Sequence, residues 1–171
     1  MTVESGVLLV DDHRIVLEGL ALLIDRQDNL HVCGTANDAR SALSAVSTTN
    51  PRVVIVDIAL GHDDGLELIK VIHSQWPEVG ILALSMHSES MYAERALRAG
   101  ASGYLRKDDA PERFLEALQT VLDGGVHISP EIKERVFSRA MGRAVEDCRM
   151  PTESLSDREL TVLRLMGAGR T

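Results

Sequence analysis

Cysteine is scarce and long apolar runs are absent in this chain of 171 residues. The two cysteines, Cys33 and Cys148, lie far apart and form no disulfide framework, so a reducing cytoplasm is the expected location. No apolar run approaches the roughly 20 residues that a membrane-spanning helix needs. The N-terminal MTVESG also has neither the basic nor the apolar segment of a secretion signal. These absences argue against a secreted or membrane protein.

Several common site motifs are also missing. VLLVDDHR has no glycine where a dinucleotide fold or a P-loop would place its phosphate-binding turn. DIALGHDDGLEL resembles a calcium loop only superficially, because Ala59 and Gly61 occupy ligand positions and Leu68 replaces the bidentate acid. The six histidines show no ligand spacing, and Cys33 lies within a predicted strand. Zinc sites and catalytic thiols are therefore not expected.

Negative charge is concentrated in the first three quarters of the chain. The formal net charge is -8, made up of -9 over residues 1–125 and +1 over residues 126–171. The first segment would repel a phosphate backbone, whereas the second is close enough to neutral to belong to a nucleic-acid binder.

Short apolar runs alternate with amphipathic stretches along the first 125 residues. The runs predict strands at 7–10, 30–36, 53–57, 80–85 and 102–107, and the stretches predict helices at 14–26, 38–49, 65–76, 88–100 and 110–125. Asp38, Gly100 and Pro111 fit helix ends as an N-cap, a C-terminal stop and a first-turn proline. Strict alternation with nearly apolar strands predicts an α/β protein with a doubly wound, five-stranded parallel sheet.

Four of the five predicted strands end in, or directly before, chemistry-bearing residues, namely Asp11-Asp12, Asp57, Ser85 and Lys107. In a doubly wound sheet, ligands bind at the carboxyl ends of the strands, so these side chains should converge. Three crowded carboxylates repel one another, and Mg²⁺ would remove that cost. Asp57 could then act as a nucleophile toward a phosphoryl group, with Lys107 neutralising charge and Ser85 donating a hydrogen bond. Taken singly, each could be a surface or cap residue, and Asp12 could cap the first helix.

This set of strand-end residues resembles the receiver domain of bacterial two-component response regulators, over about residues 5–125. VDDHRIVLEGL and ASGYLRKD resemble the NarL/FixJ subfamily in particular. The resemblance implies a flavodoxin/CheY-like strand order of 2-1-3-4-5. It also implies that Asp57 is phosphorylated by a histidine kinase in the presence of Mg²⁺.

The resemblance implies roles for individual residues as well. Asp12 and Asp57 would bind Mg²⁺ directly, Asp11 mostly through water, and the backbone carbonyl of Ala59 would be a further ligand. Ser85 and Lys107 would hold the phosphoryl group. Tyr104 occupies the position of a rotameric aromatic switch, although it could equally be an aromatic residue of the core.

The chain departs from the family pattern after Asp57. Such receivers usually have Met-Pro where this chain has Leu60 and Gly61. Because glycine loosens a loop that proline would restrict, loop rigidity and phosphoryl lifetime could differ. Asp63 and Asp64 are expected to be solvated loop acids, and His13 and His87 to be packing or exposed residues beside the site.

The last third of the chain reads as a linker and the start of a second domain. HISPEIKERVFSRAMGRA (127–144) predicts an amphipathic helix that starts at Ser129-Pro130, within a linker over residues 126–150. LSDRELTVLRLMGAGRT, with Ser156 and Glu159 as a capping box, resembles the first helix of a LuxR-type helix-turn-helix domain. We therefore expect a receiver at 1–125 and a truncated DNA-binding domain at 151–171. Without a recognition helix the chain should not bind DNA specifically.

The leading interpretation is a response regulator that accepts a phosphoryl group and regulates transcription, with at most slow self-phosphorylation or dephosphorylation. Phosphorylation would rearrange the face of helix 88–100 and helix 110–124, where a homodimer would form, and the full-length protein would bind promoter DNA. One alternative is a phosphatase of the haloacid dehalogenase type, although Ala59 stands where those enzymes have a second aspartate. Another is a degenerate receiver that binds its partner constitutively.

Overall fold

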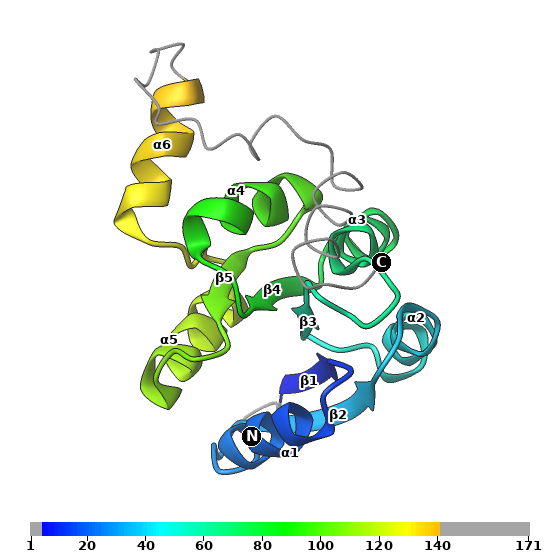
Figure 1. Ribbon diagram of the computed structural model, residues 1–171. Helices are drawn as coiled ribbons and strands as arrows, with labels where there is room; N and C mark the ends of the chain where they lie inside the picture. The colour runs from blue at the N-terminus through cyan, green and yellow to red at the C-terminus, as the bar shows by residue number, and fades with distance from the viewer. Residues whose placement is uncertain (1–4, 141–171) are drawn as a thin grey trace, which may run out of the picture. The chain divides into compact units, whose positions relative to one another are not determined.

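A computed structural model describes residues 5–140 and shows a parallel sheet with helices on both faces (Figure 1). The strands are β1 (Ser5–Val10), β2 (Leu30–Ala36), β3 (Val53–Asp57), β4 (Gly80–Ser85) and β5 (Gly103–Arg106). The helices are α1 (Arg14–Ile24), α2 (Ala39–Thr49), α3 (Gly65–Gln75), α4 (Glu89–Ala99), α5 (Pro111–Leu122) and α6 (Pro130–Ala140). The predicted alternation is confirmed, and most boundaries fall within three residues of those expected.

The strand order is β2-β1-β3-β4-β5, which confirms the predicted doubly wound sheet. All neighbouring strands run parallel, and their register aligns the carboxyl ends. Val10 pairs with Val56, Asp57 pairs with Leu84, and Ser85 pairs with Arg106. This register brings Asp57 and Ser85, at the ends of β3 and β4, to the same edge of the sheet as the residues that follow β1 and β5.

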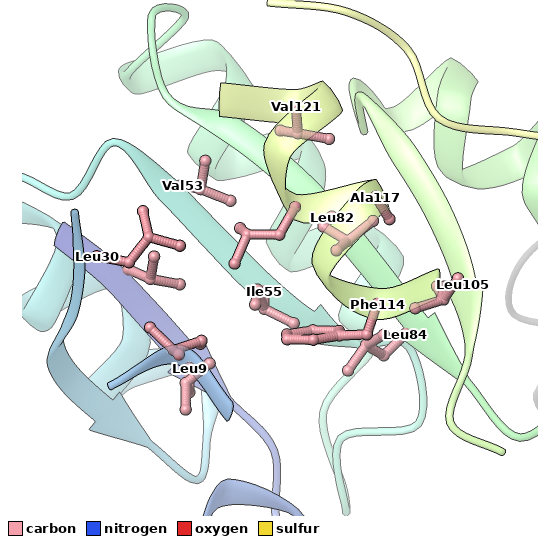
Figure 2. Close-up of a cluster of buried hydrophobic side chains, with 13 residues drawn as sticks. Leu9, Leu30, Val53, Ile55, Leu82, Leu84, Leu105, Phe114, Ala117 and Val121 are labelled. Atoms are coloured by element: carbon pink, nitrogen blue, oxygen red, sulfur yellow. The ribbon is translucent and has the colours of Figure 1, made fainter. Parts of the chain in front are cut away.

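An aliphatic core fixes the strands that carry this edge. Figure 2 shows Phe114, Ala117 and Val121 of α5 packed toward side chains of the central strands. The strand residues of this cluster include Leu9, Val53, Ile55, Leu82, Leu84 and Leu105, all buried. Burial of each side chain of this size stabilises the fold by about 1.5–3 kcal/mol, so this core holds the strands, and with them the strand ends, in place.

The three helix ends predicted from single residues are confirmed. The Asp38 side chain accepts a hydrogen bond from the Ser41 amide at 2.7 Å, Pro111 opens α5, and Gly100 ends α4 with a φ of 111°. Asp12 does not cap α1. The N-cap position is His13, which makes no side-chain cap hydrogen bond.

Beyond α5, His127 pairs with Gly103 of β5, which the sequence did not predict, and α6 then begins at the predicted Pro130. The rest of the expected 126–150 linker and the helix-turn-helix segment 151–171 lie outside the described residues from position 141 onward. Between residues 5 and 140, no helix has both the length and the apolar character needed to cross a bilayer.

Candidate functional site

Asp57 is a buried carboxylate at the end of the central strand β3, with 1% of its surface exposed. Its Oδ1 accepts a hydrogen bond from the Ala59 amide at 2.9 Å, and its Oδ2 accepts one from Lys107 Nζ at 2.8 Å. Burial raises the pKa of Asp57 above its ordinary value, and Lys107 offsets this only in part. The ionised form of Asp57 is therefore less favourable than it would be in water, and further positive charge nearby would stabilise it.

Lys107 bridges two buried carboxylates. Its Nζ lies 2.6 Å from Asp11 Oδ2 as well as 2.8 Å from Asp57 Oδ2, and its side chain is only 7% exposed. Burial alone would lower the pKa of Lys107, but its hydrogen bonds to Asp11 and Asp57 outweigh that effect and raise it. Lys107 is thus a fixed cation at the edge where the strands β1, β3 and β5 end.

Acidic groups and one imidazole cluster beside this lysine. Asp11, Asp12, His13 and Asp57 each place one potential ligand atom within 4.8 Å of the others. Asp11 is buried, whereas Asp12 is exposed to solvent. Hard carboxylate oxygens are the ligands that Mg²⁺ prefers, and a single lysine faces two buried carboxylates here, so this donor set fits a divalent cation.

His13 was expected only as an exposed or packing residue. Its side chain is 62% exposed, yet Nδ1 lies 3.1 Å from Asp11 Oδ1 and 2.9 Å from Asp12 Oδ1. No spacing signal predicts this contact, which depends on the turn between β1 and α1.

A pocket of about 400 Å³ opens beside the acidic pair, on the side of β2. Besides Asp11 and Asp12, it is lined by Arg14, Leu17, Thr35, Ala36, Asn37 and Ser41. The cluster is therefore open to solvent through Asp12 while Asp57 stays buried.

Ser85 and Tyr104 meet on the backbone of His87. Ser85 is fully buried, and its Oγ accepts a hydrogen bond from the His87 amide at 3.0 Å. The Tyr104 hydroxyl donates to the His87 carbonyl oxygen at 2.9 Å. Burial raises the pKa of Tyr104 to about 12. Tyr104 is thus a core residue, and it also holds the segment between β4 and α4.

The loop after Asp57 turns through Gly61, which has a left-handed φ of 54°. The Gly61 amide donates to the Ala59 carbonyl oxygen at 3.2 Å. A carbonyl oxygen has two lone pairs, so the Ala59 oxygen can still accept a second interaction. Proline, with its φ near −65° and no N–H, could not adopt this turn, so the absence of Met-Pro corresponds to a different loop conformation.

Asp63 is an exposed loop acid, as expected, but it and the half-buried Asp64 also accept hydrogen bonds from backbone amides. The Asp63 side chain accepts from the Ala39 amide at 2.8 Å and so joins this loop to the start of α2. Asp64 is the N-cap of α3 and accepts from the Leu66 amide at 2.9 Å. Both carboxylates hold the loop that follows Asp57.

Gly65 is a residue that the sequence analysis missed. A Cβ atom there would collide with the backbone carbonyl of Asp57 and lie 2.6 Å from Ile58 Cα. Only glycine allows α3 to start this close to the strand end. The one sequence signal was a glycine at the first position of a predicted helix, where no left-handed turn is needed.

Residues 7–119 match the family model of the response regulator receiver domain. The chain belongs to this family. It is 34% identical over 165 residues to the transcriptional regulatory protein MctR of Rhizobium johnstonii, covering 96% of this chain and 74% of that one. The family match and the strand-end geometry favour a receiver over the phosphatase of the haloacid dehalogenase type.

Solved structures agree with this assignment. A LuxR-family two-component response regulator from Aurantimonas sp. has a TM-score of 0.72 at 33% identity, covering 81% of this chain and 99% of that one. Salmonella enterica RcsB, solved on a promoter with beryllofluoride, has a TM-score of 0.70 at 25% identity, covering 97% of this chain and 78% of its own. The chain is a two-component response regulator of the transcription-regulating kind.

Proposed function

We propose that Asp57 accepts a phosphoryl group from a histidine kinase, with Mg²⁺ held by Asp11, Asp12, Asp57 and the Ala59 carbonyl. The observation that carries this proposal is the state of Asp57. It is a buried carboxylate with a raised pKa, bonded to Lys107 and placed beside an open acidic cluster. A bound Mg²⁺ would supply the missing positive charge at this site.

Phosphoryl transfer then needs little movement of the acceptor. An oxygen of Asp57 forms the new P–O bond while the P–N bond of the kinase phosphohistidine breaks, and the electron pair stays on the imidazole nitrogen. Lys107, already 2.8 Å from Asp57 Oδ2, neutralises charge on the phosphoryl oxygens. The Ser85 hydroxyl donates a hydrogen bond to one of those oxygens. The product is an acyl phosphate on Asp57.

The output we propose is regulated binding of promoter DNA. Support comes from the MctR relative, whose name is that of a transcriptional regulator, and from RcsB, whose structure was solved on a promoter. The receiver would occupy residues 1–125, the linker 126–150, and the start of a LuxR-type helix-turn-helix residues 151–171. A homodimer through the α4 and α5 face is the proposed active assembly, in the cytoplasm.

In this proposal the protein accepts a phosphoryl group and does not act as a phosphatase with repeated turnover. Ala59 has only a methyl side chain where a phosphatase of the haloacid dehalogenase type would carry its acid/base aspartate. Hydrolysis of the acyl phosphate would therefore rely on water without a side-chain base at position 59, and would be slow.

Acetyl phosphate with Mg²⁺ tests the acceptor directly. We expect intact-mass spectrometry to show one phosphoryl group on the wild type, dependent on Mg²⁺ and removed by hydroxylamine. Asp57→Ala should remain unmodified. Asp108→Ala is the matched control, since Asp108 is an exposed acid next to Lys107 that pairs with Arg106, and it should be modified like the wild type. Full modification of Asp57→Ala would refute the proposal.

A further inference from the structure

The segment between α5 and α6 is attached to the outer edge of β5 (Figure 1). The His127 amide donates to the Ser102 carbonyl oxygen at 2.9 Å, and the Tyr104 amide donates to the His127 carbonyl oxygen at 3.0 Å. A Cβ on Gly103 would lie only 3.1 Å from that same His127 oxygen. The glycine thus permits a close backbone contact that a larger residue would disturb.

A side chain of α4 holds the same segment two residues further along the chain, at Ser129. Glu89 Oε1 accepts a hydrogen bond from the Ser129 amide at 2.6 Å, and Ser129 Oγ accepts from the Ile132 amide at 3.3 Å. Ile128 and Ile132 are buried, with 9% and 2% of their surfaces exposed. The first turn of α6 is therefore fixed to the receiver by a charged hydrogen bond, a backbone bridge and two apolar side chains.

These attachments share residues with the proposed phosphoryl switch. Tyr104 holds His127 through its backbone amide and His87 through its hydroxyl. Ser85 holds His87 through its Oγ, and Glu89 is two residues further along the same segment. A movement of the segment from Ser85 to Glu89 would therefore reach Ser129 directly.

We propose that Glu89 and His127 form a latch that holds residues 127–132 against the receiver and opens when Asp57 is phosphorylated. The inference rests on the proposed function. To donate to a phosphoryl oxygen, Ser85 must turn toward Asp57, and the His87 amide then loses its acceptor. The segment before α4 follows, Glu89 withdraws from Ser129, and the start of the linker is released. Phosphorylation thereby controls the freedom of whatever follows the linker.

Residue-resolved amide hydrogen exchange by NMR on the whole chain tests the latch. Beryllofluoride with Mg²⁺ serves as the phosphoryl analogue. We expect the Ser129 amide of the wild type to exchange about tenfold faster with beryllofluoride, the loss expected for one charge-assisted hydrogen bond. Glu89→Ala should show the faster exchange without beryllofluoride. Glu89→Gln keeps an acceptor oxygen and should stay near the wild-type rate.

Two further variants separate the latch from general loosening of α4. Glu94→Ala removes an acid of the same helix that pairs with Arg98, and it should leave Ser129 protected. Gly103→Ala pushes on His127 rather than on Glu89, and it should speed exchange at the His127 and Tyr104 amides. Unchanged protection of Ser129 in Glu89→Ala, or equal loss in Glu94→Ala, would overturn the latch.

The two proposals fail in different ways. If beryllofluoride changes the His87 amide but leaves Ser129 protected, the latch is wrong and Asp57 remains the acceptor. If beryllofluoride with Mg²⁺ changes no amide around Asp57, Ser85 and His87, the acceptor proposal fails, and phosphorylation cannot open the latch.

Discussion

Lys107 Nζ lies 2.8 Å from Asp57 Oδ2, although 50 residues separate them along the chain. The same ammonium lies 2.6 Å from Asp11 Oδ2, so one cation compensates two buried carboxylates. The pair is asymmetric, because the pKa of Lys107 is raised by its two partners while burial still raises that of Asp57. Lys107 therefore does not fully offset the burial of Asp57.

Substitution of Lys107 should show how far the stability of the fold depends on this cation. We expect Lys107→Ala to lower the free energy of unfolding by about 3 kcal/mol without divalent ions, because two buried carboxylates lose their partner. Urea denaturation with and without Mg²⁺ measures the loss, and Mg²⁺ should restore part of it. Lys70→Ala, at an exposed lysine paired with Glu67, is the control and should cost at most about 0.5 kcal/mol. Equal effects of the two substitutions would contradict this account.

The raised pKa of Asp57 sets the sign of a pH effect. In the unfolded chain Asp57 loses its proton near pH 3.8, whereas in the folded chain its raised pKa keeps the proton to a higher pH. The free energy of unfolding therefore falls as pH rises above about 3.8. Without divalent ions, Asp57→Asn should therefore be at least as stable as the wild type at pH 7. Mg²⁺ should stabilise the wild type and leave Asp57→Asn unchanged. Urea denaturation from about pH 3 to 8 measures both effects.

Asp38 provides a control of opposite sign. Hydrogen bonds from Ser41 lower the pKa of Asp38, so its contribution is present above pH 3.8 and is lost as pH falls. Relative to Asp38→Asn, the wild type should lose stability toward acid, whereas relative to Asp57→Asn it should gain. The same slope for both substitutions would refute the assignment of Asp57.

Tyr104 predicts an effect at high pH. Its pKa of about 12 when folded, against 10 when unfolded, gives stability that is constant below pH 10 and lost between pH 10 and 12. Tyr104→Phe should be about 1 kcal/mol less stable than the wild type at pH 8, through the lost hydrogen bond to His87. That deficit should shrink by about 1.4 kcal/mol per pH unit above pH 10. A constant difference from pH 8 to 11 would contradict the buried hydroxyl.

Gly61 should resist substitution for a conformational reason. With φ at 54°, Gly61→Ala should cost about 1 kcal/mol, and its Cβ would lie 3.4 Å from Asp12 Oδ2. Gly61→Pro should cost more, because the turn and the hydrogen bond to Ala59 would both be lost. Gly19→Ala, at an exposed position of α1, is the matched control, since the added Cβ meets nothing within 4 Å and the substitution should stabilise the helix. Thermal unfolding of the three variants decides.

The strand-end rule let the sequence predict where the site residues would meet. Apolar runs that stop at Asp11, Asp57, Ser85 and Lys107 fix which end of each strand carries a functional group, and parallel order does the rest. Signals confined to neighbouring residues, such as the Asp38 cap, were also confirmed, because they depend only on residues close together in the sequence. The roles of these residues in metal binding and phosphoryl transfer remain predictions.

Contacts between distant backbone segments could not be predicted. Asp63 contacts Ala39, and Glu89 contacts Ser129, because the fold brings segments far apart in the sequence together. Neither pair has a spacing pattern that the sequence could show. The bridge from Gly103 to His127 involves a single residue on each side, too short for any strand periodicity to show. Gly65 was missed because its constraint comes from the backbone of Asp57 and Ile58, not from its own φ.

The bridge at His127 also bears on unwanted strand pairing at the edge of the sheet. β5 is the last strand of the sheet, and an uncovered edge offers its amides and carbonyls to any extended chain. His127 occupies the Tyr104 amide and the Ser102 carbonyl, so the seven-residue segment between α5 and α6 shields part of this edge. A receiver cut directly after α5 would bare that edge, and its solubility would fall even though every residue of the acidic site was intact.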